Sequence, residues 1–444
     1  MSLTIGQQVT ATAFQSTVTV QQKLGEGGQG IVYWVDSAHG PQALKWYNSV
    51  QATDEQRQAI HTLVQSGPPR GPAGRRFVWP LSLVTAPHTP LFGYLMPLIE
   101  TQRFATLGEV WARLKPAPDY PTLCAISAQI ANSYRALHLA GYCYRDLNAG
   151  NLLFDPRTAE VLICDNDNVG VNRASQCQVL GTMEFMAPEV ILGQADPSTE
   201  TDLYSLASLL FHLWCWHHPL HGLLEYNVRC WDLPAKRYVY GERPVFLFDP
   251  QDASNRPPND PDYAGVRRLW QHCPPSLRDL FRRAFTVGLR DPARRVTEGE
   301  WQRLFWHLRD GAIPCPTCQA ANLWEPALPA LSCWHCGTSI ALPPKLLCQH
   351  ADGTRTTLLL SRDATLFERH LNPTAQDDEA LSVRGQVVQH PSDPSIFGLR
   401  NLTTTPWRAT FTDGTVQEVP PQRAAPINLG LRLDMAGVVA TIVA

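Results

Sequence analysis

The segment LGEGGQGIV, residues 24–32, is the feature that most limits the fold of this chain. Gly25, Gly27 and Gly30 have the GxGxxG spacing, which by itself occurs both in dinucleotide-binding folds and in ordinary turns. A dinucleotide-binding loop continues directly into a helix, whereas β-branched and aromatic residues follow here. The segment therefore predicts a hairpin between two strands, whose backbone amides can lie over phosphates.

Strand-like runs and turns alternate around this hairpin. The runs STVTVQQKL, IVYWV and QALKWY lie within residues 15–47 and predict an antiparallel meander. A helix is expected from about Thr53 to Gln65, with Thr53 or Asp54 as its N-cap. Residues 77–100 return to strand character, and residues 122–306 are mainly helical in pattern. The order is a small β-rich lobe followed by a larger helical lobe.

Lys45 lies on the third of these runs, thirteen residues after Val32. A single ammonium at this position could reach the α- and β-phosphates of a nucleotide under the glycine hairpin. The alternative is a solvated strand lysine beside a flexible turn.

A second polar cluster occurs in YCYRDLNAGNLLF, residues 142–154. Arg145 and Asp146 are followed by Asn151 and then at once by a hydrophobic run. This order suits a site that holds a hydroxyl near one carboxylate and a metal near one carboxamide. Fourteen residues after Asn151, Asp165 ends a second short strand, and a turn between the two strands would bring Asn151 and Asp165 together.

In this order and context, Lys45, Asp146, Asn151 and Asp165 resemble the catalytic residues of protein kinases. The resemblance covers residues 20–310 and is strongest to the bacterial Ser/Thr class. It implies that Asp146, beside Arg145, accepts the proton of a substrate hydroxyl, and that Asn151 and Asp165 bind Mg²⁺ or Mn²⁺. The ATP-binding residues that it implies are Gly25, Gly27, Gly30, Val32, Ala43, Lys45, Met96 and Leu98. Met96 would lie at the hinge to adenine, or alternatively at the plain end of a core strand.

The segment GTMEFMAPE, residues 181–189, resembles the end of a kinase activation segment. The resemblance implies structural roles for Asp202, at the start of a central helix, and for an ion pair between Glu189 and Arg295.

Arg145 would permit control by a phosphate on this segment, because a guanidinium binds phosphate through two hydrogen bonds. Ser175 and Thr182 are the candidate phosphorylation sites. Alternatively, Thr182 hydrogen-bonds near Asp146, as the matching threonine does in Ser/Thr kinases.

Several positions depart from the kinase pattern. Asn148 stands where Ser/Thr kinases usually have a lysine that helps to neutralise the transferring phosphoryl group, so slower chemistry or another cation is expected. Asn166 and Asp167 replace the usual Phe-Gly, and Asp167 is expected to need a glycine-like backbone and to be a candidate metal ligand. Glu55 is the candidate partner of Lys45, although it lies earlier than the family spacing.

Two CxxC pairs separated by fourteen residues predict a metal site. The four cysteines are Cys315, Cys318, Cys333 and Cys336. Two such pairs in Pro/Gly-rich turns indicate a tetrahedral Cys₄ zinc site of structural type. His335 as a substitute ligand and disulfide bonds are the alternatives. Almost no Lys or Arg accompanies Trp324 and Trp334 there, which favours a protein contact or a spacer over nucleic acid.

Short alternating strands from about residue 346 to 444 predict a small all-β sandwich, which faintly resembles a forkhead-associated domain. The expected fold is α+β. We expect a bilobal kinase domain over residues 1–310, with lobes of about 1–98 and 99–310, a Cys₄ zinc ribbon over 311–343 and the sandwich over 344–444. Together these parts resemble kinases of the tellurite-resistance-linked phosphorylation triad, whose partners are a von Willebrand A-type protein and a metal-dependent phosphatase.

Composition limits the remaining function classes. The net charge of −3 provides no general attraction to nucleic acid or anionic lipid. We expect no signal peptide, no membrane span and a cytoplasmic location, since twelve cysteines without a signal favour a reducing compartment. The predicted protein is a Ser/Thr kinase that uses ATP with Mg²⁺, contains a structural Zn²⁺ ion, and phosphorylates itself and a partner protein. The alternatives are a nucleotide-binding pseudokinase scaffold and, third, a zinc-ribbon nucleic-acid binder.

Overall fold

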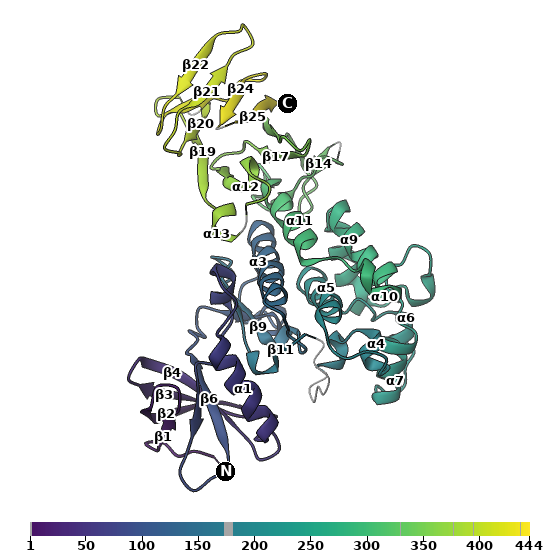
Figure 1. Cartoon of the computed structure of the whole chain (residues 1–444). Coiled ribbons are helices and arrows are strands. Elements are labelled where there is room, and N and C mark those ends of the chain that lie inside the picture. Colours follow the sequence, from purple (N-terminus) through teal and green to yellow (C-terminus); the bar gives the residue numbers. More distant parts are fainter. Residues whose placement is uncertain (1, 173–180, 329, 376, 394, 436) are drawn as a thin grey trace. The chain divides into compact units, whose positions relative to one another are not determined.

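The computed structural model describes residues 2–172, 181–328, 330–375, 377–393, 395–435 and 437–444 (Figure 1). Its internal contacts divide the chain into two compact units. Unit 1 comprises Met1–Ala117, Gln129–Gln271 and Asp279–Gly299, and unit 2 comprises Pro118–Ala128, His272–Arg278 and Glu300–Ala444. The domain boundaries expected from the sequence, near residues 310 and 343, stay predictions.

Unit 1 begins with a closed antiparallel barrel in the strand order β1-β2-β3-β4-β6-β5. Its strands are β1 (Gln8–Ala11), β2 (Ser16–Gly27), β3 (Gly30–Ser37), β4 (Gly40–Tyr47), β5 (Ser82–Thr85) and β6 (Phe92–Pro97). The predicted meander is confirmed, because β2 pairs with β3 and β3 with β4 in antiparallel register. Alternate apolar residues such as Val18, Val20, Val35 and Leu44 fill its interior, as the two-residue period of a strand requires.

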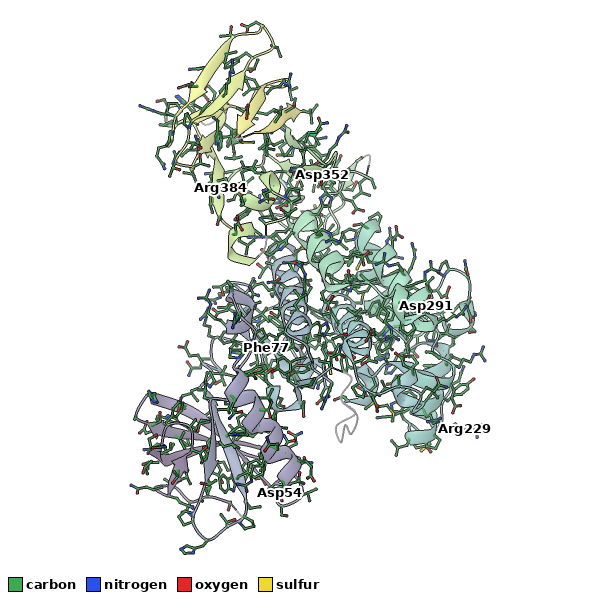
Figure 2. The ribbon with its side chains drawn as sticks, in the orientation of Figure 1. Asp54, Phe77, Arg229, Asp291, Asp352 and Arg384 are labelled. Carbon is green, nitrogen blue, oxygen red and sulfur yellow. The ribbon has the colours of Figure 1, made fainter. Side chains whose placement is uncertain are left out.

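Helix α1 (Asp54–Ser66) packs beside the barrel (Figure 1). It begins where the sequence predicts, since the Thr53 side chain accepts a hydrogen bond from the first helical turn. Ile60 and Leu63 are buried on its inner face. Asp54 lies in the exposed first turn, where a carboxylate interacts favourably with the helix dipole (Figure 2).

Most later elements up to residue 310 are helical, as predicted. They are α2 (Leu107–Trp111), α3 (Tyr120–Leu139), α4 (Pro188–Ile191), α5 (Thr199–Cys215), α6 (Leu223–Tyr226), α7 (Leu233–Arg237), α8 (Ala264–His272), α9 (Pro275–Phe285), α10 (Val287–Arg290) and α11 (Glu298–Asp310). Ser198 caps α5, and nearly every side chain of this helix is buried, so it forms the centre of the helical lobe. In the described part of the chain, no helix has the length and apolar character that a bilayer span requires.

Short strands, one before α2 and four between α3 and α4, position the polar loops. They are β7 (Ala105–Thr106), β8 (Tyr142–Cys143), β9 (Leu152–Phe154), β10 (Val161–Ile163) and β11 (Gly170–Val171). The pairs β9–β10 and β8–β11 are antiparallel. The loop from β8 to β9 and the loop from β10 to β11 therefore lie side by side.

Unit 2 contains two small hairpins and two larger sheets. The hairpins are β12 (Ala312–Pro314) with β13 (Ala321–Leu323), and β14 (Leu331–Ser332) with β15 (Ser339–Ile340).

One of the two larger sheets has six strands in the order β17-β16-β25-β24-β21-β22, and the other has four in the order β18-β19-β20-β23. Their strands are β16 (Lys345–Gln349), β17 (Arg355–Leu359), β18 (Thr365–Phe367), β19 (Val383–Gln389), β20 (Phe397–Asn401), β21 (Trp407–Thr410), β22 (Val416–Val419), β23 (Ala424–Pro426), β24 (Arg432–Met435) and β25 (Val438–Val443). Short helices α12 (Glu368–Leu371) and α13 (Asp377–Ala380) lie between β18 and β19. Side chains from both sheets, including Leu346, Val387 and Trp407, share one apolar core.

Candidate active site

The glycine hairpin leaves open space beside its backbone. Gly27 pairs with Gly30 where β2 turns into β3. A Cβ atom on Gly30 would lie 2.1 Å from the carbonyl oxygen of Trp46, so the close strand contact permits only glycine there. Hypothetical Cβ atoms on Gly25 and Gly27 meet nothing within 4 Å. The space beside the hairpin backbone at these two positions is therefore open.

The remaining residues expected at the nucleotide lie on one face of the barrel. Val32 is directly opposite Lys45, and Ala43 is directly opposite Met96. Opposite and alternate residues of antiparallel strands share a face, so these four side chains line a common surface. Leu98 follows the end of β6 and is 37% exposed.

The ammonium group of Lys45 is buried between two carboxylates. Its Nζ atom lies 2.9 Å from Oδ2 of Asp167, 3.3 Å from Oδ1 of Asp165 and 2.6 Å from Oε1 of Gln29. Burial by itself would lower the pKa of Lys45, but the carboxylates of Asp167 and Asp165 offset this effect and raise the pKa above its usual value. Lys45 is therefore a fixed positive charge.

Helix α1 reaches this site through Gln56. The side chain of Gln56 donates to the hydroxyl of Tyr47 at 3.0 Å, and this hydroxyl donates to Asp167 at 2.5 Å. Glu55 is exposed, and it is not among the hydrogen-bonding partners of Lys45 in the described part of the chain. The structure thus does not bring the expected Glu55 partner to Lys45.

The carboxylate of Asp146 is held on the loop between β8 and β9. Its Oδ1 atom accepts hydrogen bonds from the backbone nitrogen and the hydroxyl of Thr182, both at 2.8 Å, and from Nδ2 of Asn148 at 3.1 Å. Its Oδ2 atom accepts from Asn168 at 3.4 Å. Asn148 thus contributes a neutral donor where a lysine would contribute a charge.

The pairing of β9 with β10 places Asn151 beside Cys164, the residue before Asp165. The Nδ2 atom of Asn151 donates a hydrogen bond to the backbone carbonyl oxygen of Asp146 at 3.0 Å. The backbone carbonyl oxygen of Asn151 accepts a hydrogen bond from the backbone nitrogen of Cys164 at 2.8 Å. Since the amide nitrogen is used internally, the side-chain oxygen of Asn151 is the atom available as a ligand. Burial raises the pKa of Asp165, with Lys45 opposing the shift and Asp167 adding to it. Amide and carboxylate oxygens are ligands that suit Mg²⁺.

The backbone of the loop after β10 differs from the expectation for Asp167. The left-handed conformation lies at Asp165, with φ 51° and ψ 44°, and Asp167 does not have a positive φ. The expectation of a glycine-like backbone at Asp167 is wrong, because residues 166–168 form a 3₁₀ turn. This turn directs the Asp167 side chain into the protein, where the residue is only 4% exposed.

The start of α5 fixes the backbone of the loop that contains Asp146. Asp202 accepts hydrogen bonds from the backbone nitrogen of Tyr144 at 2.6 Å and from that of Arg145 at 3.2 Å. His138 bonds to the same carboxylate at 3.0 Å. The guanidinium of Arg145 donates to the carbonyl oxygen of Val171 at 3.4 Å.

Glu189 and Arg295 meet as a bidentate ion pair. Nη1 and Nη2 of Arg295 lie 2.8 and 2.9 Å from the two carboxylate oxygens of Glu189. The Arg295 side chain is 2% exposed and also donates to the carbonyl oxygens of Gly288 and Glu200. This pair fastens the end of the segment that contains Thr182 to the helical lobe.

The structure describes only one of the two candidate phosphorylation sites. Ser175 lies outside the described residues. The Thr182 hydroxyl is exposed but hydrogen-bonded to Asp146, which favours the second of the two roles expected for it.

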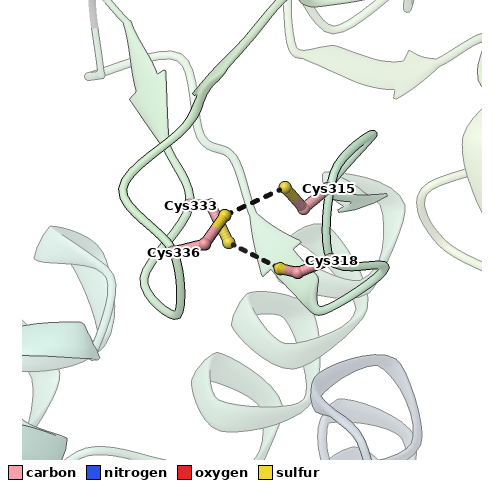
Figure 3. Close-up of side chains that lie close together, drawn as sticks. All are labelled: Cys315, Cys318, Cys333 and Cys336. Atoms are coloured by element: carbon pink, nitrogen blue, oxygen red, sulfur yellow. Dashed lines mark hydrogen bonds between the residues drawn. The ribbon is translucent and has the colours of Figure 1, made fainter.

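Four thiols cluster at the turns of the two hairpins in unit 2 (Figure 3). The sulfur atoms of Cys315, Cys318, Cys333 and Cys336 all lie within 4.8 Å of one another. The pairs Cys315–Cys336 and Cys318–Cys333 are 3.6 and 3.5 Å apart, too far for disulfide bonds. Thiolates bound at about 2.3 Å to a tetrahedral zinc ion are separated by about 3.8 Å, so this cluster has the dimensions of a Cys₄ zinc site.

The environment of Cys333 already favours a thiolate. Burial opposes its ionisation, but the backbone N–H groups of Cys336 and His335 lower its pKa to about 6. The His335 backbone donates to the Cys333 sulfur at 3.4 Å.

Residues 101–253 match the family model described as the protein kinase domain. This part of the chain is therefore similar to protein kinase domains. The matched region contains the loops of Asp146, Asn151 and Asp165, while the barrel with Lys45 lies before it.

The curated relatives of this region are named as protein kinases, several of them as serine/threonine-protein kinases. Serine/threonine-protein kinase sck2 of Schizosaccharomyces pombe is 32% identical over 123 residues, which are 26% of this chain and 18% of that protein. Serine/threonine-protein kinase PkaB of Streptomyces coelicolor is 25% identical over 218 residues, 47% of this chain and 50% of that protein. cGMP-dependent protein kinase 2 of Mus musculus is 30% identical over 130 residues, 27% of this chain and 16% of that protein. The chain thus spans half or less of the length of these relatives, and the matches support a serine/threonine protein kinase.

Two functional contacts were missed by sequence reasoning. Asp167 was expected to adopt a glycine-like backbone and to be a candidate metal ligand. Its side chain instead bonds to Lys45. His138 was not identified, although it contacts Asp202 and Glu298. The second acid of CDNDN could have indicated a role for Asp167, but nothing local in the sequence indicates one for His138.

Proposed function

We propose that the chain is an ATP-dependent protein Ser/Thr kinase that transfers the γ-phosphate to Ser or Thr residues of itself and of a partner protein. The observation that carries this proposal is the meeting of Lys45 and Asp165. These residues are 120 positions apart on β4 and on the loop after β10, and their charged atoms are 3.3 Å apart beside the glycine hairpin. A site that binds a nucleotide triphosphate requires such a lysine and such a carboxylate at the phosphates.

Each residue has a distinct role in this mechanism. Lys45 and the amides of the glycine hairpin bind the phosphates, and Asp146 accepts the proton of the attacking hydroxyl through the oxygen that Thr182 leaves available. Asn151 and Asp165 would hold Mg²⁺ or Mn²⁺, which supplies positive charge against the transferring phosphoryl group. Asn148 orients Asp146 but adds no charge, so transfer should be slower than in kinases with a lysine there.

The test is transfer from γ-labelled ATP with Mg²⁺ or Mn²⁺ to the chain itself and to a triad-type partner. Asp146→Asn should lower the rate by at least about 10²-fold, the usual scale for loss of a catalytic acid or base. Asp165→Asn removes a proposed metal ligand and should also lower the rate of transfer. Asp155→Asn is a matched control, because Asp155 is a buried carboxylate just after β9 that pairs with Arg103. Unchanged transfer in Asp146→Asn would contradict the mechanism.

A pseudokinase scaffold is the second candidate. The neutral Asn148 and the engagement of Lys45 by Asp167 favour it. ATP binding without transfer, even in the presence of partners, would support this candidate over the kinase.

We infer further that Cys315, Cys318, Cys333 and Cys336 bind a structural zinc ion as a small ribbon. The two sheets that follow would form a forkhead-associated-like sandwich. By resemblance to the phosphorylation triad, the protein partners would be a von Willebrand A-type protein and a metal-dependent phosphatase. Binding of each purified partner to the full chain tests this assignment, and the absence of any complex with either would contradict it.

A further inference from the structure

The carboxylate of Asp167 is committed to Lys45. Both of its oxygens lie within hydrogen-bonding distance of the ammonium, at 3.2 and 2.9 Å. The Asp167 side chain is 0% exposed and that of Lys45 is 7% exposed, whereas the Asp165 side chain is 44% exposed. A buried carboxylate without a partner is costly, so Asp167 and Lys45 hold each other in place.

The surroundings restrict Asp167 further. Its Oδ2 atom also accepts a hydrogen bond from the hydroxyl of Tyr47. This hydroxyl in turn accepts a hydrogen bond from the side chain of Gln56 on helix α1. Gln56 also approaches the carbonyl oxygen of Asp167 at 3.5 Å. The helix therefore contacts the ion pair through neutral groups, and its acidic residue Glu55 is exposed.

An ammonium has three N–H donors, and each has a different kind of acceptor here. Asp167 is the buried acceptor, Asp165 is half exposed, and Gln29 on the glycine hairpin is neutral. Entry of a phosphate would cost least by replacing the neutral Gln29 oxygen. Asp167 would keep its bonds while Lys45 binds the nucleotide.

We propose that Asp167 is the positioning residue that holds Lys45 for the nucleotide phosphates, so that the lysine needs no carboxylate from helix α1. This inference rests on the proposed nucleotide site, but not on phosphate transfer. A movement of helix α1 would then disturb Lys45 less than it would if the lysine formed a direct ion pair with a carboxylate on that helix.

The experiment compares binding of MgATP and of adenosine to the full chain by calorimetry. Asp167→Asn should weaken ATP binding about tenfold, the change that corresponds to one modest polar interaction, and leave adenosine binding unchanged. In a Lys45→Met background, Asp167→Asn should have no further effect, because Asp167 acts through Lys45. Asp155→Asn is the matched control: Asp155 is 5% exposed and Asp167 is 4% exposed, and neither affinity should change in it.

Four outcomes would overturn the inference. They are unchanged ATP affinity in Asp167→Asn, an equal loss of ATP and adenosine affinity, a further loss in the Lys45→Met background, and a tenfold loss of ATP affinity in Glu55→Gln.

Failure of the kinase proposal is seen separately. A chain that binds with the expected pattern but transfers no phosphate contradicts kinase activity and supports the role of Asp167. A chain that binds no ATP overturns both.

Discussion

At the scale of single residues, the hydrogen bonds to Asp146 divide its two oxygens. Oδ1 accepts three hydrogen bonds, from Thr182 and Asn148, while Oδ2 accepts one long bond at 3.4 Å from Asn168. Oδ2 therefore retains capacity for a substrate hydroxyl. Thr182 is thus a positioning residue for the proposed base, whether or not it is ever phosphorylated.

Thr182→Ala should slow self-phosphorylation about tenfold, because a hydrogen bond to a charged group contributes roughly 1.5–3 kcal/mol. Thr182→Ser keeps the hydroxyl and should retain most of the rate. Initial rates with γ-labelled ATP measure both variants. Equal rates for Thr182→Ala and the unchanged chain would show that the hydroxyl does not orient Asp146 for transfer.

At the scale of elements, helices α3, α5 and α11 meet through one histidine. His138 of α3 bonds to Asp202 of α5 and to Glu298 at the start of α11. Burial would lower its pKa, but the two carboxylates raise the pKa to about 9. Because Asp202 also binds the backbone of the loop that contains Asp146, the charge on His138 stabilises that loop indirectly.

This pair of contacts predicts a pH dependence of stability. The folded pKa of His138 is about 9 and its usual value is 6.5, so its contribution is complete below pH 6.5 and is lost as the pH rises toward 9. The contribution is on the order of 3 kcal/mol. His138→Gln should therefore have a lower melting temperature than the unchanged chain at pH 6, with the gap closing near pH 9.

The lowered pKa values of His212 and His221 lie outside this window. Burial lowers the pKa of His212 to about 4 and that of His221 to about 3, so their effects on stability occur below pH 6.5. A gap between the chain and His138→Gln that stays constant from pH 6 to pH 9 would contradict the assignment.

The pair of Glu189 and Arg295 predicts a large cost for removing one partner. Arg295→Leu leaves the Glu189 carboxylate uncompensated in a site where the arginine is 2% exposed, and should lower the free energy of unfolding by roughly 3–5 kcal/mol. Arg295→Lys should lose less because it keeps the positive charge, although one ammonium cannot form both bonds. Urea unfolding measures both, and adding Glu189→Gln to Arg295→Leu should recover part of the loss.

Local sequence patterns predicted the helices and strands, but they did not predict contacts between residues far apart in the sequence. The meander and the N-cap of α1 follow from strand periodicity and from Thr53, which act over a few residues. Asn151 and Asp165 flank the paired strands β9 and β10, which the same kind of local pattern predicted. The contacts of Asp167 with Lys45 and of His138 with Glu298 join residues 122 and 160 positions apart, so only the folded chain brings them together.

At the scale of the whole molecule, metal binding should decide whether the cysteine hairpins of unit 2 are ordered. Hairpins of two or three residues per strand bury too little apolar surface to be stable alone. A structural zinc ion contributes on the order of 10 kcal/mol of binding energy to such a module.

The purified chain should contain about one zinc ion, and a chelator should make residues 311–343 sensitive to protease. Metal analysis and limited proteolysis test this prediction. Cys333→Ser should lose the zinc, whereas Cys348→Ser is a control because Cys348 is buried in the separate core of the two sheets. Zinc that remains bound in Cys333→Ser would exclude the four-thiolate site.

The sheets of unit 2 have a mechanical consequence that follows from the pairing of β16 with β25. Lys345 lies opposite Val443, and the five register pairs continue to Gln349 opposite Val439. A pulling force applied at Lys345 and Val443 therefore acts at one end of this ladder, and its hydrogen bonds would carry the load one after another. Tension in that direction would unzip the two strands at a lower force than shear along them. Strands β16 and β25 would therefore separate readily when Lys345 and Val443 are pulled apart.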